Sequence, residues 1–165
     1  MTTYQPDPET VATQAALSNE LADELLEKET GINYVEVIET VISSLEQDDS
    51  AMVSQTDAGH LWKFKYGSVE VFVQLSGSTE EDTLTVWSSV LKLPAKNEPE
   101  LMRQLLTMNG TETFEARFAI VNDEVVVITT RTVAELSPGE ISRAITIVAT
   151  IADNNDDALQ KQFSH

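Results

Sequence analysis

Apolar residues recur along this chain at two different spacings, and the spacing predicts which segments are helices and which are strands. A repeat of three to four residues marks one face of a helix, and a repeat of two marks one face of a strand. By this rule the sequence predicts helices and strands in the order ααββββαββα. The helices span residues 9–29, 33–45, 98–109 and 138–152, and the strands span residues 51–55, 60–66, 69–76, 83–93, 113–120 and 124–131.

Capping signals set the starts of the last two helices. Asn97 is followed by a proline and by Glu100, and Ser137 is followed by Pro138 and Glu140. A polar cap, a first-turn proline and a glutamate three residues on are typical of a helix start. We therefore expect both helices to begin directly after these caps.

Two dipeptides predict where the chain reverses in its second half. Asn109-Gly110 tolerates the left-handed conformation that ends many helices, so the third helix is predicted to stop there. Asn122-Asp123 lies between two strand patterns and predicts a tight hairpin. In the strand before that hairpin, alternation predicts one buried face made of Phe114, Ala116, Phe118 and Ile120.

The order of elements predicts an α+β fold with two layers. Runs of strands joined by short turns favour a mostly antiparallel sheet, and the helices are then expected on one of its faces. This gives an acidic N-terminal helical arm (residues 1–32), one α+β domain (residues 33–160) and a disordered tail (residues 161–165).

A sheet covered on one face leaves a second face whose residues can be predicted by alternation. If the valines of residues 69–76 face the helices, Phe72 points the other way, and the same argument places Trp87 on that open face. The strand 124–131 has apolar residues on both faces, with Val126 and Ile128 opposite its other valines. We take Phe72, Trp87, Val126 and Ile128 as candidate partner-binding residues, although the N-terminal helix folding back over them remains an alternative.

Charge and composition exclude several classes of function. The 165 residues include ten basic and 28 acidic ones, a net charge of −18, and the basic residues form no run. Such a chain repels phosphate backbones, so we expect no nucleic acid partner. No apolar stretch is long enough for a membrane span and the N-terminus is polar, which makes the cytoplasm the default location. With no cysteine, thiolate chemistry is excluded.

Catalytic and metal-binding patterns are weak. The two histidines, His60 and His165, have no partner in the sequence, and no nucleophile elbow or glycine-rich phosphate loop is present. Residues 153–157 resemble half of a calcium loop, but Ala158 and Ser164 stand where glycine and glutamate are required. We therefore predict no enzyme activity, no cofactor and no metal site.

The second half of the chain resembles a known family. The leucines of residues 101–109, the strand Phe-Glu-Ala-Arg-Phe-Ala-Ile at residues 114–120, the strand at residues 125–130 and Leu-Ser-Pro-Gly-Glu-Ile at residues 136–141 resemble YbjN domains. The resemblance implies the fold of type III secretion chaperones, a curved antiparallel sheet with flanking helices. It also implies a homodimer that binds protein segments; many family members are described as bacterial sensory-transduction regulators.

These observations lead to two hypotheses. The first is a non-enzymatic, chaperone-like homodimer that binds a protein client on its open sheet face and through strand addition at a sheet edge. The second is a regulatory module that binds a small molecule between helices and sheet and acts through a partner protein.

Overall fold

The computed structural model describes residues 31–165, so the predicted helix at residues 9–29 lies outside the described part. Residues Tyr34–His165 form one compact unit. The predicted order of its elements is confirmed. The elements are α2 (Tyr34–Leu45), β1 (Met52–Thr56), β2 (Gly59–Tyr66), β3 (Val69–Leu75), β4 (Thr83–Lys92), α3 (Glu98–Thr111), β5 (Arg117–Val121), β6 (Glu124–Thr132) and α4 (Pro138–Phe163).

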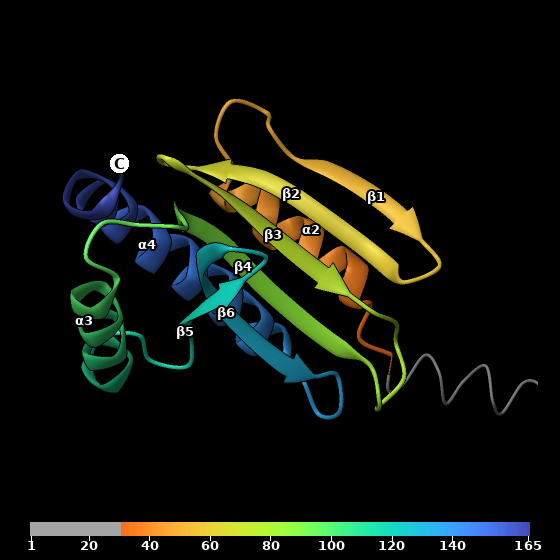
Figure 1. Cartoon of the computed structure of the whole chain (residues 1–165). Helices are drawn as coiled ribbons and strands as arrows, with labels where there is room; N and C mark the ends of the chain where they lie inside the picture. Colours follow the sequence, from red (N-terminus) through yellow and green to blue (C-terminus); the bar gives the residue numbers. More distant parts are fainter. Residues whose placement is uncertain (1–30) are drawn as a thin grey trace, which may run out of the picture. The chain divides into compact units, whose positions relative to one another are not determined.

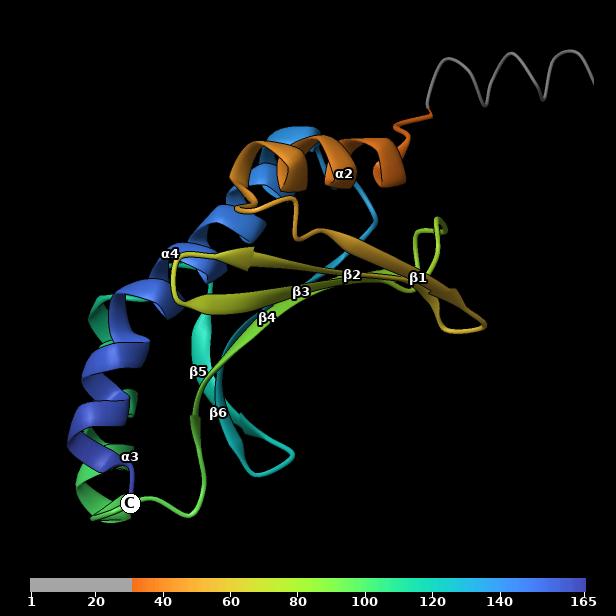
Figure 2. The ribbon, with the colours of Figure 1, turned by 90° about the horizontal axis from the view of Figure 1, so that it is seen from above.

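The six strands form a single sheet in the order β1-β2-β3-β4-β6-β5. Every neighbouring pair is antiparallel. The two halves of the chain meet where β4 pairs with β6 (Figure 1). The sheet is curved, and α2 and α4 lie together on one side of it (Figure 2). The predicted α+β fold with two layers is confirmed.

The core fills the space between the sheet and the helices. On β3, Val71 and Val73 are fully buried, and across from them α4 contributes Ile141, Ile145 and Val148, all with no exposed surface. Because strand side chains alternate, the intervening residues of β3 point to the opposite face. That face carries no described helix and is called the open face below (Figures 1 and 2).

The capping box predicted for α4 is present. Ser137 Oγ accepts a hydrogen bond from the Glu140 backbone N–H, and the Glu140 carboxylate accepts one from the Ser137 backbone N–H. The expected tail at residues 161–165 is wrong, because α4 continues to Phe163, whose side chain is 1% exposed. The calcium-like stretch lies within this helix, where Asp153 and Asp156 accept hydrogen bonds from Ser68 in the β2–β3 turn.

The third helix, α3, begins at Glu98 directly after Asn97, as predicted, but its start lacks the expected capping hydrogen bond. Asn97 adopts a left-handed conformation, and its side chain makes no capping hydrogen bond to the helix backbone. Its amide donates to the Glu100 carboxylate instead, and the Glu98 carboxylate accepts from the Ala95 backbone N–H.

The structure also corrects the end of α3. The helix passes through Asn109 and Gly110 and ends at Thr111. The Asn109 side chain is used elsewhere: its Oδ1 accepts from the Phe118 backbone N–H at 2.7 Å, and its Nδ2 donates to the Phe118 carbonyl at 3.1 Å. The amide therefore holds the outer edge of β5 much as a neighbouring strand would.

The strand predicted at residues 113–120 is shorter than expected. Phe114 lies in the turn after α3 at a φ of 52° and is 78% exposed, so its predicted burial is wrong. Pairing with β6 begins only at Arg117. Ala116 and Phe118 are buried as predicted, but Ile120 is 53% exposed. The Asn122-Asp123 hairpin is confirmed, with both residues at positive φ.

We predict that Asn109→Ala destabilises the protein by about 1–3 kcal/mol, because two backbone groups of an edge strand lose their partner. Urea unfolding followed by circular dichroism measures this change. Asn154→Ala is the matched control, since Asn154 is exposed on α4 and makes no hydrogen bond among the described residues. Equal stability of the two variants would contradict the role of Asn109.

Candidate protein-binding face

One row of side chains crosses all six strands on the open face. In the strand register, each residue of the row is paired with the residue of the row on the neighbouring strand. Directly paired residues point to the same side of a sheet. In sheet order the row is Met52, Lys63, Phe72, Trp87, Ile128 and Arg117. We call it the cross-sheet row; its centre is apolar, with a cation on each side.

Phe72 and Trp87 form the centre of the row. Their rings stack with centroids 5.3 Å apart and planes 10° apart. Both side chains are half-buried, because each covers part of the other. The Lys63 Nζ lies 5.9 Å from the centroid of the Phe72 ring, within reach of a cation–π contact. The stack is thus fixed in place and still offers apolar area to a partner.

The structure brings all four candidate partner-binding residues to the same face, in two different environments. Ile128 pairs with Trp87 and is half-buried, so it extends the apolar centre. Val126 pairs with Ser89 and is only 2% exposed, although it stands apart from the main core. Val126 therefore supports the face from within and has little surface to offer a partner.

The open face carries more basic than acidic residues, unlike the chain as a whole. Its strand positions include the basic residues Lys63, Lys65, Lys92 and Arg117 and the acidic residues Glu70 and Glu124. A register shift between Ser89 and Leu91 resets the alternation of β4. The shift lets Lys92 pair with Glu124 on this face.

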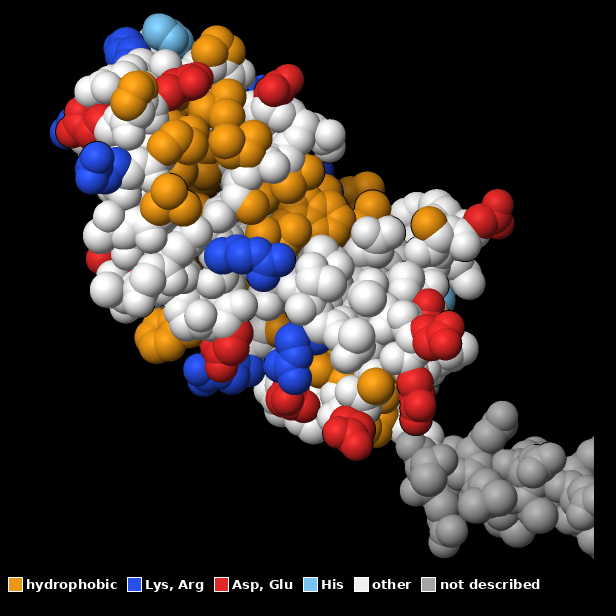
Figure 3. Space-filling model, turned by 60° about the horizontal axis from the view of Figure 1, so that its bottom comes forward, with side chains coloured by type: hydrophobic (Ala, Val, Ile, Leu, Met, Phe, Trp, Pro, Cys, Tyr) orange, Lys and Arg blue, Asp and Glu red, His pale blue; other side chains and the backbone are white. Residues whose placement is uncertain are grey.

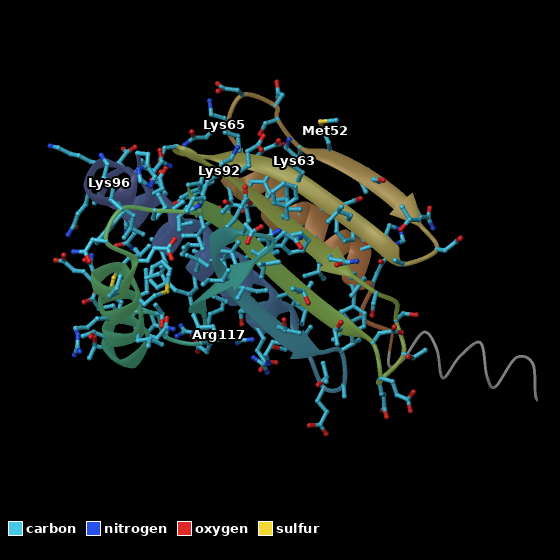
Figure 4. All side chains as sticks on the ribbon, viewed as in Figure 1. Met52, Lys63, Lys65, Lys92, Lys96 and Arg117 are labelled. Atoms are coloured by element: carbon cyan, nitrogen blue, oxygen red, sulfur yellow. The ribbon has the colours of Figure 1, made fainter. Side chains whose placement is uncertain are left out.

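Two of these four cations make ion pairs. Lys63 Nζ lies 2.8 Å from Glu70 Oε1, and Lys65 Nζ lies 3.6 Å from Asp48 Oδ2. All four of these side chains are at least 41% exposed, so each pair contributes little to stability. Within the described part of the chain, Lys92 and Arg117 make no ion pair. Figure 4 shows Lys63, Lys65 and Lys92 towards one flank of the sheet and Arg117 towards the other.

Apolar side chains are also exposed on the edge strand β1 and on α3. Met52 on β1 is 67% exposed, and Leu106 on α3 is 71% exposed. The space-filling view shows apolar side chains gathered into a patch with basic side chains next to it (Figure 3). An apolar surface rimmed by charge is typical of a protein interaction site.

Sequence reasoning found the aromatic pair but missed the cations. The alternation of β3 and β4 was enough to place Phe72 and Trp87 on one face. Lys63 and Arg117 join them only because β2 follows β3 in the sheet and β5 follows β6. Alternation within each strand could have predicted which face each cation occupies. It could not have predicted that the two cations share one row, because that depends on strand order and register.

A separate cavity lies on the helix side, between α4 and the ends of β5 and β6. Its volume is about 240 Å³, and its apolar part includes Ala116, Ala144 and Ile147. Two ion pairs line it: Arg131 with Glu140 at 2.8 Å, and Arg143 with Glu115 at 2.8 Å.

These ion pairs and the helix cap hold two carboxylates in the charged form. The backbone N–H of Ser137 and the guanidinium of Arg131 lower the pKa of Glu140 to about 2. The Arg143 guanidinium lowers the pKa of Glu115 below its ordinary value. Both lining carboxylates remain anionic at neutral pH and are neutralised locally by arginines.

The described residues give little support for a catalytic histidine or a metal site. His60 stacks on Trp62 with centroids 5.3 Å apart. Residues 31–165 contain no group of three potential metal ligands. Among the helices of this part, none is long and apolar enough to span a membrane.

A family model described as "Putative bacterial sensory transduction regulator", YbjN, matches residues 34–161. The chain belongs to the YbjN family. The match covers all the described helices and strands apart from the last two residues of α4. The expected membership is thereby confirmed.

A solved structure supports the fold of this YbjN domain. The "Crystal Structure of the ExsC-ExsE Complex" contains a chain that matches with a TM-score of 0.55 at 16% sequence identity. The match covers 75% of this chain and 91% of that one. At this identity the likeness shows the fold alone. No curated protein matches the chain in sequence.

We predict that Glu140 contributes to the loss of stability in acid. Its pKa falls from 4.5 to about 2 on folding, so the stabilisation is complete above pH 4.5 and is lost as the pH falls through 2. Glu140→Gln should therefore be less stable than the wild type at pH 7, and the difference should shrink towards pH 2. Urea unfolding at several pH values measures it.

The matched control for this titration is Glu81→Gln, which removes an exposed carboxyl with no hydrogen bond in the described part of the chain. A difference between Glu140→Gln and wild type that stays constant from pH 7 to about pH 2 would contradict the assignment.

Proposed function

We propose that this YbjN domain is a non-enzymatic, cytoplasmic protein-binding module that holds a segment of a client protein on its open face. The observation that carries the proposal is the Phe72–Trp87 stack, partly exposed on a sheet face that no described helix covers. Large aromatics placed among polar residues are the residues that most often anchor protein interfaces.

Apolar burial supplies the binding energy in this mechanism. Each 100 Å² of apolar surface that the client covers contributes about 2.5 kcal/mol before the cost of ordering the client. The stack is already fixed by its strands and by Lys63, so little side-chain freedom is lost on the domain's side. A rigid aromatic platform therefore binds a client at a low cost in side-chain entropy.

The edge of the sheet offers a second contact. All five residues of β1 are exposed, and β1 pairs only with β2. A client strand can therefore add to its outer edge by main-chain hydrogen bonds. The solved structure with this fold is a complex of ExsC with ExsE, which supports a protein as the partner of this domain.

The proposal includes a homodimer. Leu106, Phe114 and Ile120 near the β5 edge are 71%, 78% and 53% exposed, and a second copy would remove such side chains from water. Light scattering at several concentrations measures the oligomeric state.

We predict that Trp87→Ser or Phe72→Ser weakens client binding about tenfold or more, because an anchor in the centre of the face is lost. Peptides are selected on the wild type from a displayed random library, and their affinities are measured by fluorescence anisotropy. Val53→Ser is the control and should change affinity little, because Val53 is 57% exposed but pairs with the buried Trp62 and so points away from the open face.

Thermal unfolding shows whether each variant is folded, and light scattering gives its oligomeric state. The affinities are compared with both results in hand. If the selected peptides bind Trp87→Ser and Phe72→Ser as tightly as the wild type, the open face is not the client site.

A second candidate function is ligand sensing, which the cavity under α4 favours. Its apolar floor and paired arginines suit a small amphiphilic molecule. We expect such a ligand to raise the thermal midpoint of the wild type but not of Ala144→Phe, which fills the cavity. A metabolite screen by thermal shift tests this, and a set of ligands that acts equally on both proteins would refute it.

A further inference from the structure

The charges around the apolar centre select one kind of client. Of the ten basic residues of the chain, four lie on the open face beside only two acidic strand positions. The chain as a whole has 28 acidic and ten basic residues, so the balance at these strand positions is the reverse of the balance of the chain. Salt screens charges beyond about 8 Å at physiological ionic strength, so a bound segment experiences mainly the charges of the face itself.

The cations stand at both ends of the apolar centre. Lys63 precedes Phe72 in the cross-sheet row, and Arg117 follows Ile128. Lys65 adds to the first end, and the guanidinium of Arg117 makes no ion pair among residues 31–165. A segment lying along the row would therefore meet positive charge, then apolar surface, then positive charge again.

We infer that the client segment is acidic at both ends and apolar in its middle. This inference rests on the proposed function, since it specifies the chemistry of the segment that the open face binds. Arg117 is free to take a carboxylate by two parallel hydrogen bonds. At the other end Lys63 and Lys65 supply charge, and their exposed pairs with Glu70 and Asp48 exchange easily for a client carboxylate.

The width of the sheet sets the spacing of the acidic groups. Four strand steps separate Lys63 from Arg117, and at about 4.8 Å per step this is about 19 Å. An extended segment advances about 3.3 Å per residue, so the two acidic ends are about six positions apart, with about five residues between them. The apolar residues between them cover Phe72, Trp87 and Ile128.

The test uses two synthetic peptides that share an apolar centre of about five residues and carry either glutamates or lysines at both ends. Their binding to the full chain is measured by anisotropy of a rhodamine label. We expect the glutamate peptide to bind at least tenfold more tightly, and this preference to shrink as salt is raised. A preference below twofold, or no binding of the glutamate peptide, would overturn the inference.

Charge variants locate the effect. Lys63→Glu with Arg117→Glu should reverse the preference, and Lys63→Gln with Arg117→Gln should reduce it, since Lys65 still supplies positive charge at one end. Arg103→Glu on α3 is the matched control, since Arg103 is exposed and makes no ion pair within the described residues, and it should leave the preference intact. Thermal midpoints show whether each variant is folded. A preference that survives the double charge reversal in a folded protein refutes the assignment to these two cations.

Trp87→Ser separates this inference from the proposed function. Suppose that the wild type binds both peptides equally tightly and that Trp87→Ser lowers the affinity for both. The face then binds segments without regard to charge, and only the inference fails. If Trp87→Ser changes the affinity of neither peptide while they bind the wild type, binding occurs elsewhere and both proposals fail.

Discussion

The pairing of β4 with β6 is the contact on which the rest of this fold depends. It joins residues such as Thr85 and Thr130, which lie 45 positions apart, through a ladder that runs from Thr83–Thr132 to Lys92–Glu124. Without it, β1–β4 and the β5–β6 hairpin would be two small sheets, and α4 would lack the continuous surface on which its apolar stripe packs. Closing so long a loop costs entropy that only the completed core repays, which favours cooperative folding of both halves. The same ladder places Trp87 beside Ile128 and so completes the apolar centre of the open face.

Features governed by neighbours in sequence could be predicted from the sequence alone. The capping box at Ser137 and the turn at Asn122-Asp123 are present as predicted, because their hydrogen bonds and backbone angles are set within a few residues. Asn109 and Phe114 were misread for the opposite reason. The amide of Asn109 is used by a strand nine residues away, and pairing with β6 starts too late to include Phe114. Local propensity does not predict hydrogen-bond partners or strand pairings that the tertiary fold provides.

The candidate site likewise has a part that could be predicted from single strands and a part that could not. Alternation within β3 and β4 placed Phe72 and Trp87 correctly on one face, since that property belongs to each strand alone. The positive flanks of the row were invisible, because Lys63 and Arg117 are 54 positions apart in sequence and share the row only through strand order and register. A net charge of −18 describes the whole chain and conceals a face with the opposite balance.

The Asn109 amide also makes the sheet asymmetric as a template for polymerisation. An added strand at β5 would need the Phe118 backbone N–H and carbonyl, and both already bind this side chain. No described residue occupies the outer edge of β1 in the same way. Filaments that grow by pairing the edge strands of successive subunits require two free sheet edges on every subunit. Edge pairing is then left to β1, the edge proposed for a client strand, so growth by edge pairing stops after one added strand.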